Sequence, residues 1–117
     1  MGLGPVPAVR KLLKKTGYTI KDMDVIELNE AFASQAIACM KELEIPRYGE
    51  SEEYREEGCE RVNPYGSGIS LGHPIGCTGA RLLVTMIHEM ERKDYHVGLA
   101  TLCLGGGNAV AMAVERV

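Results

Sequence analysis

The feature that most restricts the fold is an uncharged stretch at residues 97–114, near the end of the 117-residue chain. Its length approaches the ~20 apolar residues that a transmembrane helix needs. However, residues 105–108 read GGGN and interrupt the stretch at its middle, and such a glycine run favours a turn over a helix. We therefore predict two short strands, at 96–104 and 109–114, that pair antiparallel across a glycine turn, in place of a membrane-spanning helix.

Helical and strand patterns alternate in the first half of the chain. Pro5 suits the first turn of a helix, apolar residues then recur at helical spacing, and Gly17 is a typical helix stop. A short apolar run at 24–28 predicts a strand. A second helix follows at 31–43, where charged residues are few, and we expect it to be largely buried. Its apolar stripe comprises Phe32, Ala36, Cys39 and Leu43.

The second half begins with a loop at 61–79 that is rich in glycine, proline, asparagine and serine. Glycines permit tight backbone paths there, and the apolar residues 69–71 predict a little strand within the loop. A third helix is expected from Thr78 to about Lys93, with His88 on its polar face. The side chains predicted to face inward are Leu82, Leu83, Met86, Ile87 and Met90.

The predicted order is helix, strand, helix, loop, helix, strand, strand, which is typical of one α/β layered domain. Such folds usually begin with a strand on which the first helix packs, so we expect a first strand to be lacking ahead of Pro5. A glutamate-rich insertion at about 46–61 separates the second helix from the loop. Its charges predict a solvated surface element.

Composition argues against several classes of function. The net charge of -3 and the pI near 5.6 provide no basic surface for nucleic acid. The four cysteines form no CxxC pair, so we expect a reduced, cytoplasmic protein without disulfides. His73 and Cys77 have a spacing that zinc ligands can use, but no second closely spaced pair exists, and we expect no metal site. Residues 66–72 do not match the nucleotide-binding spacing GxGxxG.

Two residues beside predicted helices are candidates for chemistry. Asn29 follows the strand at 24–28 and precedes a helix, the place where α/β proteins bind ligands. The alternative for Asn29 is a helix N-cap, a role that asparagine fills well. His73 precedes Pro74 and a helix N-terminus, whose dipole favours a neutral imidazole. That form suits a base or an oxyanion donor, and the alternative is a loop histidine bonded to the backbone.

Cys103 is a third candidate, because it ends a predicted strand just before the glycine turn at 105–107. Glycines let backbone amides approach a ligand and form an oxyanion nest. A thiol at that rim can carry protons if its pKa is lowered. The alternative is a buried strand cysteine followed by a plain hairpin turn.

The segments around these residues resemble the motifs of the thiolase family. Residues 29–33 read NEAFA, residues 72–81 match the family's GHPxGxxGAR, and residues 103–107 match its CxGGG. Residues 1–5 resemble the segment that opens this part of the family's C-terminal domain. The order and spacing match over nearly all of the chain. The resemblance implies the C-terminal half of a thiolase-like layered fold, a mixed sheet with helices on both faces, incomplete because its first strand is lacking.

The resemblance also implies a chemistry, since thiolases condense or cleave 3-ketoacyl-CoA thioesters by ping-pong acyl transfer. His73 would activate a nucleophilic cysteine and donate to the thioester oxygen, and Asn29 would hold a water that supplies the second donor. Cys103 would move the proton at the α-carbon, and the amide of Gly105 would belong to a second oxyanion hole. The pantetheine channel would be lined by Ala31, Phe32 and Met1. Coenzyme A thioesters are then substrates, and no resident cofactor is expected.

A thiolase is much longer than this chain, and its nucleophilic cysteine lies in an N-terminal domain. None of the four cysteines here has the nucleophile's context. We therefore expect a chain that is inactive alone and that works on acyl-CoA with an N-terminal thiolase half or by self-association, as a homo-oligomer. One alternative is a non-catalytic remnant or an assembly subunit that keeps the fold. Another is a ketoacyl synthase, which the CxGGG segment at Cys103 disfavours.

The lacking strand has a predicted physical consequence. In the family it lies in the middle of the sheet, so we expect two strands to lose a central partner and expose unpaired edges. The helix at 31–43 also loses cover. The isolated chain is therefore expected to aggregate, to swap strands, or to pair with a chain that supplies the first half.

Overall fold

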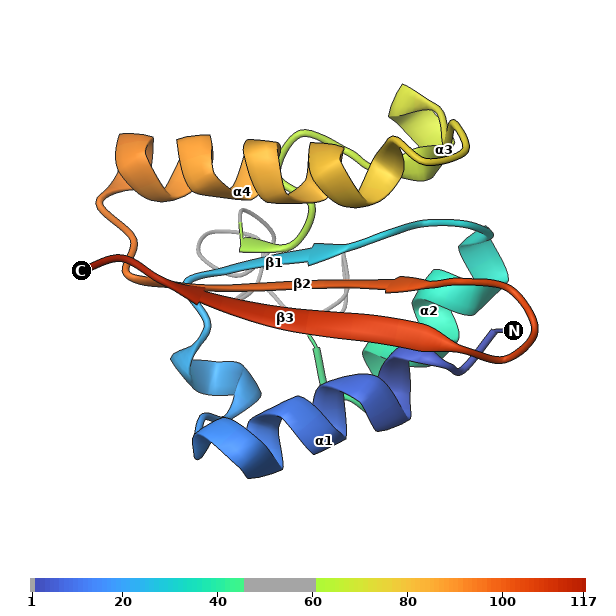
Figure 1. Cartoon of the computed structure of the whole chain (residues 1–117), viewed down its shortest axis with the longest axis horizontal. Coiled ribbons are helices and arrows are strands. Elements are labelled where there is room, and N and C mark those ends of the chain that lie inside the picture. Colours follow the sequence, from blue (N-terminus) through green and yellow to red (C-terminus); the bar gives the residue numbers. More distant parts are fainter. Residues whose placement is uncertain (1, 46–60) are drawn as a thin grey trace, which may run out of the picture.

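A computed structural model describes residues 2–45 and 61–117, which form one sheet with helices on both faces (Figure 1). The elements in chain order are α1 Pro5–Thr16, the 3₁₀ turn η1 Ile20–Asp22, β1 Val25–Leu28, α2 Ala33–Glu42, α3 Gly68–Leu71, α4 Thr78–Lys93, β2 Val97–Cys103 and β3 Ala109–Glu115. Met1 and the predicted acidic insertion, apart from its last residue, lie outside the described residues.

The sheet is mixed, as predicted. Among the described residues its order is β1-β2-β3. β1 runs parallel to β2, with Leu28 opposite Thr101, and β2 runs antiparallel to β3, with Cys103 opposite Ala109. The predicted hairpin is therefore confirmed. The expectation that two strands lack a shared central partner is wrong for these three, because they pair in unbroken order.

The helices cover the sheet in two layers, with α4 on one face and α1 and α2 on the other (Figure 1). Side chains alternate along a strand: Val25 of β1 packs in the core cluster under α4, whereas Ile26 and Leu28 pack in the cluster on the α1 side. The α4 cluster consists of Val25, Leu82, Met86, Met90 and Ala100. Because β1 is buried on both faces, its sequence lacks the alternation of a half-exposed strand.

The helix limits follow local chemistry. Gly17 adopts a left-handed conformation (φ 81°) and its N–H donates to the Leu13 carbonyl at 2.9 Å, which ends α1 as predicted. α4 begins at Thr78 and ends at Lys93, also as predicted. Within residues 2–45 and 61–117, no helix combines the length and apolar character that crossing a membrane requires.

Residues 69–71 belong to helix α3, so the short strand predicted there is wrong. The Leu71 N–H donates to the Ser67 carbonyl at 2.8 Å, which closes a helical turn. Gly66 and Gly72 flank this turn with φ of 86° and 91°, and left-handed residues on both sides limit the helix to a single turn. A segment of three residues that has no neighbouring strand to pair with is not held in an extended conformation.

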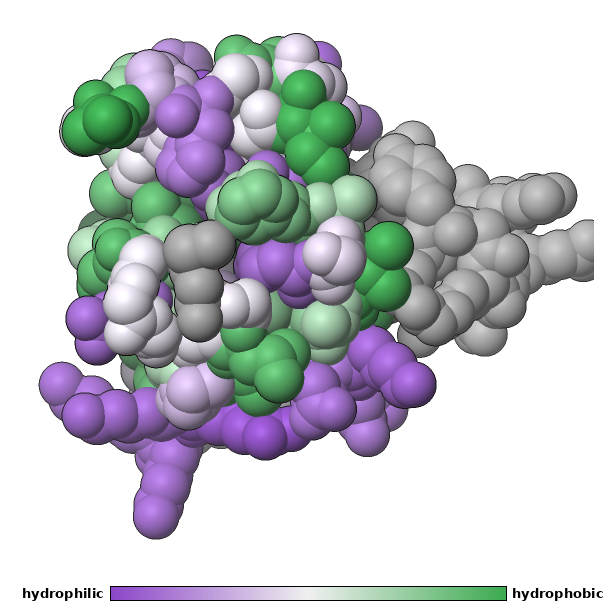
Figure 2. All heavy atoms as spheres, turned by 90° about the vertical axis from the view of Figure 1, so that its right-hand side faces the viewer, coloured by the Kyte–Doolittle hydropathy of each residue, from purple (hydrophilic) through white to green (hydrophobic). Residues whose placement is uncertain are grey.

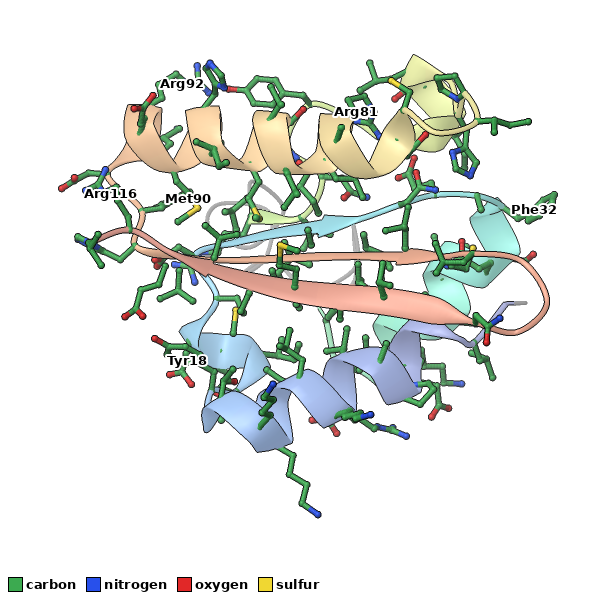
Figure 3. All side chains as sticks on the ribbon, viewed as in Figure 1. Tyr18, Phe32, Arg81, Met90, Arg92 and Arg116 are labelled. Atoms are coloured by element: carbon green, nitrogen blue, oxygen red, sulfur yellow. The ribbon has the colours of Figure 1, made fainter. Side chains whose placement is uncertain are left out.

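The burial predicted for two helices was too extensive. Cys39 and Leu43 are buried as expected, but Phe32 and Ile37 are 56% and 50% exposed, and Ile87 of α4 is 45% exposed. Phe32 points away from the sheet (Figure 3). Periodicity identifies the apolar residues of a helix, whereas burial also requires a second surface, and the three strands cover only part of each helix.

Candidate active site

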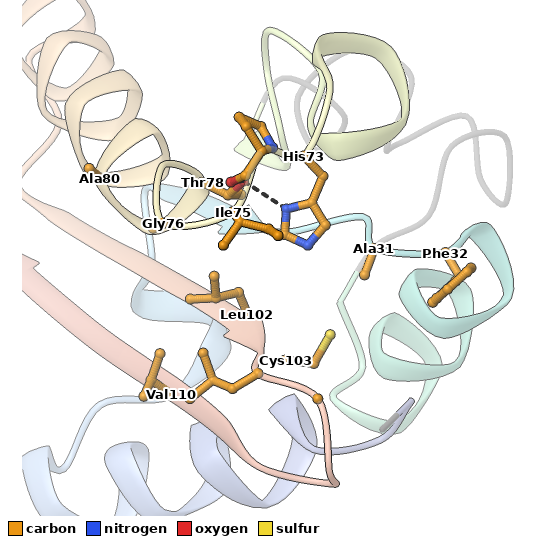
Figure 4. A pocket seen from close by; sticks show the side chains of 14 residues that line it. Ala31, Phe32, His73, Ile75, Gly76, Thr78, Ala80, Leu102, Cys103 and Val110 are labelled. Atoms are coloured by element: carbon orange, nitrogen blue, oxygen red, sulfur yellow. Dashed lines mark hydrogen bonds between the residues drawn. The ribbon is translucent and has the colours of Figure 1, made fainter.

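The candidate site lies where β1 and β2 end. Because these strands are parallel, their carboxyl ends meet at one edge of the sheet, where α/β proteins bind ligands. Asn29 follows β1, and its N–H donates to the Thr101 carbonyl of β2 at 3.0 Å. Cys103 ends β2, and the loop before α4 brings His73 to the same edge (Figure 4). Three segments that are far apart in the sequence therefore meet here.

A cavity of about 630 Å³ opens at this edge, a size that suits a small-molecule ligand. The predicted site residues on its wall are Ala31, Phe32, His73, Cys103 and Gly105. Most of the remaining wall is apolar, with Ile75, Leu102 and Val110 among its residues. Figure 2 looks onto this end of the molecule, where apolar groups lie above the strongly hydrophilic surface of α1.

His73 is held by side chains through both ring nitrogens. Its Nδ1 lies 2.7 Å from Thr78 Oγ1, the first residue of α4 (Figure 4), and its Nε2 lies 3.3 Å from Asn29 Nδ2. Thr78 Oγ1 in turn donates to the Pro74 carbonyl at 3.4 Å. The alternative of a loop histidine bonded to the backbone is not observed. The imidazole is thus oriented while its ring remains on the cavity wall.

Asn29 is fully buried and lies behind His73 rather than on the cavity wall. The alternative N-cap role is wrong, because the N-cap of α2 is Phe32, three residues later. The Asn29 amide contacts the imidazole on one side and Ser67 Oγ on the other, with Oδ1 3.4 Å from that hydroxyl. In this chain its direct action is therefore on the orientation of His73.

Cys103 is almost completely buried, with 7% of its surface exposed. Figure 4 shows its sulfur across the cavity from the His73 ring. The candidate role at the cavity rim and the alternative of a buried strand cysteine are compatible, because Cys103 is a buried strand residue that also lines the cavity. An apolar wall strengthens any charge interaction that the thiol makes, because its dielectric constant is low.

The glycine turn after Cys103 provides backbone that a ligand can approach. Gly105, Gly106 and Gly107 all have positive φ, at 74°, 57° and 85°. The turn is closed by hydrogen bonds from Asn108 N–H to the Gly105 carbonyl (3.1 Å) and from Leu104 N–H to the Asn108 carbonyl (2.9 Å). Gly105 lines the cavity. A side chain on the left-handed glycines would be strained, so the sequence GGG is what this turn requires.

Two other cysteines are near the site without joining it. Cys77 is exposed, but it is not among the residues that line the cavity. Cys39 lies within α2, where burial raises the pKa of its thiol, and its Sγ donates to the Gly2 carbonyl at 3.3 Å. A protonated, hydrogen-bonded thiol is a poor nucleophile. In the described part of the chain no three His, Cys, Asp or Glu side chains gather as a metal site.

Sequence reasoning missed the polar groups that support His73. Thr78 was identified only as the expected start of a helix and as part of the 72–81 segment, and Ser67 carried no signal beyond its place in a loop rich in small polar residues. A pair of ionisable residues, buried Glu27 of β1 and half-buried Arg81 of α4, was also missed, and burial raises the pKa of Glu27 to about 7. Its signal was a glutamate inside an otherwise apolar strand.

The chain is similar to known proteins over nearly its whole length. Residues 1–116 match the family model described as thiolase, C-terminal domain. The chain is 52% identical over 116 residues to an acetyl-CoA acetyltransferase of Chromobacterium violaceum, and 50% identical over 117 residues to a beta-ketoadipyl-CoA thiolase of Pseudomonas aeruginosa. It covers 26% and 27% of those proteins, respectively, while they match 99% and 100% of it.

A solved structure agrees with this result. The crystal structure of the Bacillus anthracis acetyl-CoA acetyltransferase superposes with a TM-score of 0.86 at 47% sequence identity. The match covers 99% of this chain and 26% of that protein. The chain therefore spans about a quarter of the relatives that it resembles.

Proposed function

This chain belongs to the thiolase family, as its C-terminal domain, and on that premise we propose that it supplies one half of an acyltransferase site for 3-ketoacyl-CoA thioesters. The observation that carries the proposal is the shared cavity, in which His73 and Cys103 occupy opposite walls (Figure 4). No hydrogen bond joins the two side chains among the described residues, so their shared position on the cavity is not explained by a direct contact. A base and a thiol that face one space are what acyl transfer followed by carbon–carbon bond chemistry needs.

His73 is the base for the first half-reaction. In the condensing direction it takes the proton of a nucleophilic cysteine supplied by the rest of the thiolase, and that thiolate attacks the carbonyl carbon of an acyl-CoA. The carbon–sulfur bond to coenzyme A then breaks, coenzyme A leaves as a thiolate, and the acyl-enzyme remains. The Asn29 amide keeps the imidazole in place through its contact with Nε2. In the family's scheme Asn29 also holds a water that donates to the thioester oxygen, and its position next to His73 is compatible with that role.

Cys103 is the proton carrier for the second half-reaction. In the condensing direction its thiolate removes a proton from the α-carbon of an acyl-CoA. The resulting enolate attacks the acyl-enzyme, a carbon–carbon bond forms, and the nucleophilic cysteine leaves as a thiolate. Gly105 lies on the same cavity wall, and its N–H is proposed as a donor to the oxyanion that forms on the acyl group.

The substrate is proposed to be a coenzyme A thioester, with no resident cofactor. Ala31 and Phe32 are placed on the cavity wall and are candidates for contact with the pantetheine arm. The relatives do not favour one acyl group, because those named for acetyl-CoA, beta-ketoadipyl-CoA and 3-ketoacyl-CoA are 50–52% identical to this chain.

The partner is proposed to be the remaining part of a thiolase, in a cytoplasmic homo-oligomer. The exposed apolar residues of α2 and α4 are consistent with surfaces that another part of the protein covers. A cytoplasmic location accords with the cysteines at 39, 77 and 103, which are free thiols. Fatty acid metabolism is the corresponding process.

A domain-replacement experiment tests the proposal. This chain replaces the matching 26% of the Chromobacterium violaceum acetyl-CoA acetyltransferase, and thiolysis of acetoacetyl-CoA is followed by the loss of substrate absorbance. We expect the chimera to be active, His73→Ala in the chimera to be inactive, and the isolated chain to be inactive. Activity of the isolated chain would overturn the assignment of the nucleophile to the missing part. A folded but inactive chimera would favour the non-catalytic remnant or assembly subunit.

A further inference from the structure

Ser67 lies at the centre of a hydrogen-bond arrangement next to His73. Its side chain is fully buried in the loop before α3. Two donors reach its hydroxyl oxygen: the backbone N–H of Glu30 at 3.3 Å and Arg81 Nη2 at 3.4 Å. A hydroxyl has two acceptor lone pairs and one hydrogen. With both lone pairs engaged, the hydrogen is left to donate to Asn29 Oδ1, which lies 3.4 Å away.

This donation decides which way the Asn29 amide faces. Because Oδ1 accepts from Ser67, the NH₂ group of the amide must face the other way, and Nδ2 lies 3.3 Å from His73 Nε2. Nε2 must then be an acceptor. The neutral imidazole therefore carries its hydrogen on Nδ1, which donates to Thr78 Oγ1 at 2.7 Å. Nε2 retains the electron pair that a base requires.

Two neighbouring features hold Ser67 in this position. The loop presses against Asn29 at Gly68, where a Cβ would lie 3.0 Å from Asn29 Oδ1 and 2.7 Å from the Glu30 carbonyl. Arg81 lies between α4 and the sheet (Figure 3), where its charge interacts with that of Glu27. The hydrogen bond from its Nη2 to Ser67 thus comes from a cation held by the core.

We propose that Ser67 is a positioning residue of the acyl-transfer site, which fixes the Asn29 amide and thereby keeps His73 in the tautomer with its hydrogen on Nδ1. Arg81 supports Ser67 in this role. Ser67 does not line the cavity and does not touch substrate. The inference deepens the proposed function and rests on it for its catalytic consequence. The tautomer itself is a property of this chain and can be measured without catalysis.

The catalytic consequence is tested in the chimera. Ser67→Ala removes the hydroxyl, and we expect kcat to fall by about tenfold with little change in KM, because orientation of the base is lost while the binding wall remains. Ser34→Ala is the matched control, since Ser34 is an exposed serine of α2 that does not line the cavity, and it should leave both constants unchanged. Equal kcat in Ser67→Ala and the parent chimera would overturn the proposal.

The tautomer is tested by ¹⁵N NMR of the chimera labelled at its histidines. In the parent we expect the protonated ring signal of His73 at Nδ1. His88, whose Nδ1 lies 2.9 Å from the Val84 carbonyl, provides an Nδ1–H reference, and exposed His96 provides a solvent-averaged one. In Ser67→Ala the His73 pattern should move toward that of His96, and in Ser34→Ala it should not. An unchanged Nδ1–H pattern in Ser67→Ala would contradict the proposal even if the chimera were inactive.

Discussion

Glu27 of β1 and Arg81 of α4 face each other between the helix and the sheet, but neither Glu27 oxygen has a hydrogen-bond donor within the described residues. Arg81 Nε and Nη1 also have no acceptor there. Two charged groups share a buried space without a direct bond, so the guanidinium only partly offsets the cost of burying the carboxylate. Burial accordingly dominates and raises the pKa of Glu27 from 4.5 to about 7.

The raised pKa of Glu27 predicts a pH-dependent stability. Between pH 4.5 and about 7 the folded chain keeps the Glu27 proton while the unfolded chain releases it, so the free energy of unfolding should decrease as the pH rises. The total decrease should be about 3 kcal/mol, since one pKa unit corresponds to about 1.4 kcal/mol. The charged groups that act on this pKa are Arg81, which lowers it, and Glu30 and Glu89, which raise it.

Denaturant unfolding of the chain at a series of pH values measures this slope. Glu27→Gln should remove it, because no proton is exchanged at that position. Glu91→Gln, at an exposed glutamate of α4, is the control and should keep the slope. A difference between parent and Glu27→Gln that stays constant from pH 4.5 to 7 would show that the carboxyl titrates normally.

Substitutions of Cys103 and of Cys77, which lie at the same end of the molecule, should differ in their effect on activity. In the chimera, Cys103→Ser should lower kcat for acetoacetyl-CoA thiolysis by about 100- to 10,000-fold, because a hydroxyl is a far weaker proton carrier than a thiol. Cys77→Ser should have little effect, since Cys77 is exposed and absent from the cavity wall. Similar losses in both variants would remove Cys103 from its proposed role.

Gly68 and Gly79 should respond in opposite ways to the same substitution. A Cβ at Gly68 would meet the Glu30 carbonyl oxygen at 2.7 Å, so Gly68→Ala should destabilise the fold by about 1–3 kcal/mol. Gly79 lies in α4, and a Cβ there meets only Leu102 Cδ1, at 4.0 Å. Gly79→Ala should therefore be neutral or stabilise by up to about 1 kcal/mol, as helix propensity favours alanine. Chemical denaturation of both variants checks the prediction, which fails if Gly68→Ala is as stable as the parent.

The isolated chain is expected to self-associate through an apolar strip beside α4. Val110 and Met112 of β3 lie opposite Leu102 and Ala100 of β2 and share their face, but they remain 48% and 51% exposed. Exposed apolar patches of this kind favour association. Sedimentation should show oligomers that dissociate in the double variant Val110→Lys/Met112→Lys.

The control for this strip is Lys14→Ala on the exposed side of α1, which should leave the oligomers unchanged. A monodisperse parent monomer that melts cooperatively would contradict the prediction.

The elements that depend on neighbouring residues could be predicted from the sequence. Gly17 ends α1 through its own backbone conformation, and the glycine turn joins β2 to β3, so both follow from local chemistry. The segment at 69–71 was misjudged because a stretch of three residues is too short to show a period, and its helical turn depends on the two flanking glycines. Phe32 is exposed because burial requires a second surface that covers the side chain, and the helical period of the sequence does not show whether that surface is present.

The candidate site could be predicted in its residues but not in its contacts. Asn29, His73 and Cys103 were identified by motif, each at the end of an expected element. The hydrogen bond between Asn29 and His73 joins residues 44 positions apart, and no local pattern encodes such a pairing. Ser67 was missed for the same reason, since its importance comes only from the groups that surround it in the fold.

The parallel pairing of β1 with β2 also makes the site sensitive to any error in strand alignment. Leu28 lies opposite Thr101, and the next residue, Asn29, is bonded to that strand two positions before Cys103. A slip of one residue would turn every side chain of the shifted strand to the opposite face. The Cys103 thiol and the Asn29 amide could not then both reach the space beside His73. The proposed acyl-transfer activity of the chimera would thus serve as a sensitive reporter of correct folding, because a chain misaligned by a single residue would retain its secondary structure and lose the arrangement of its site.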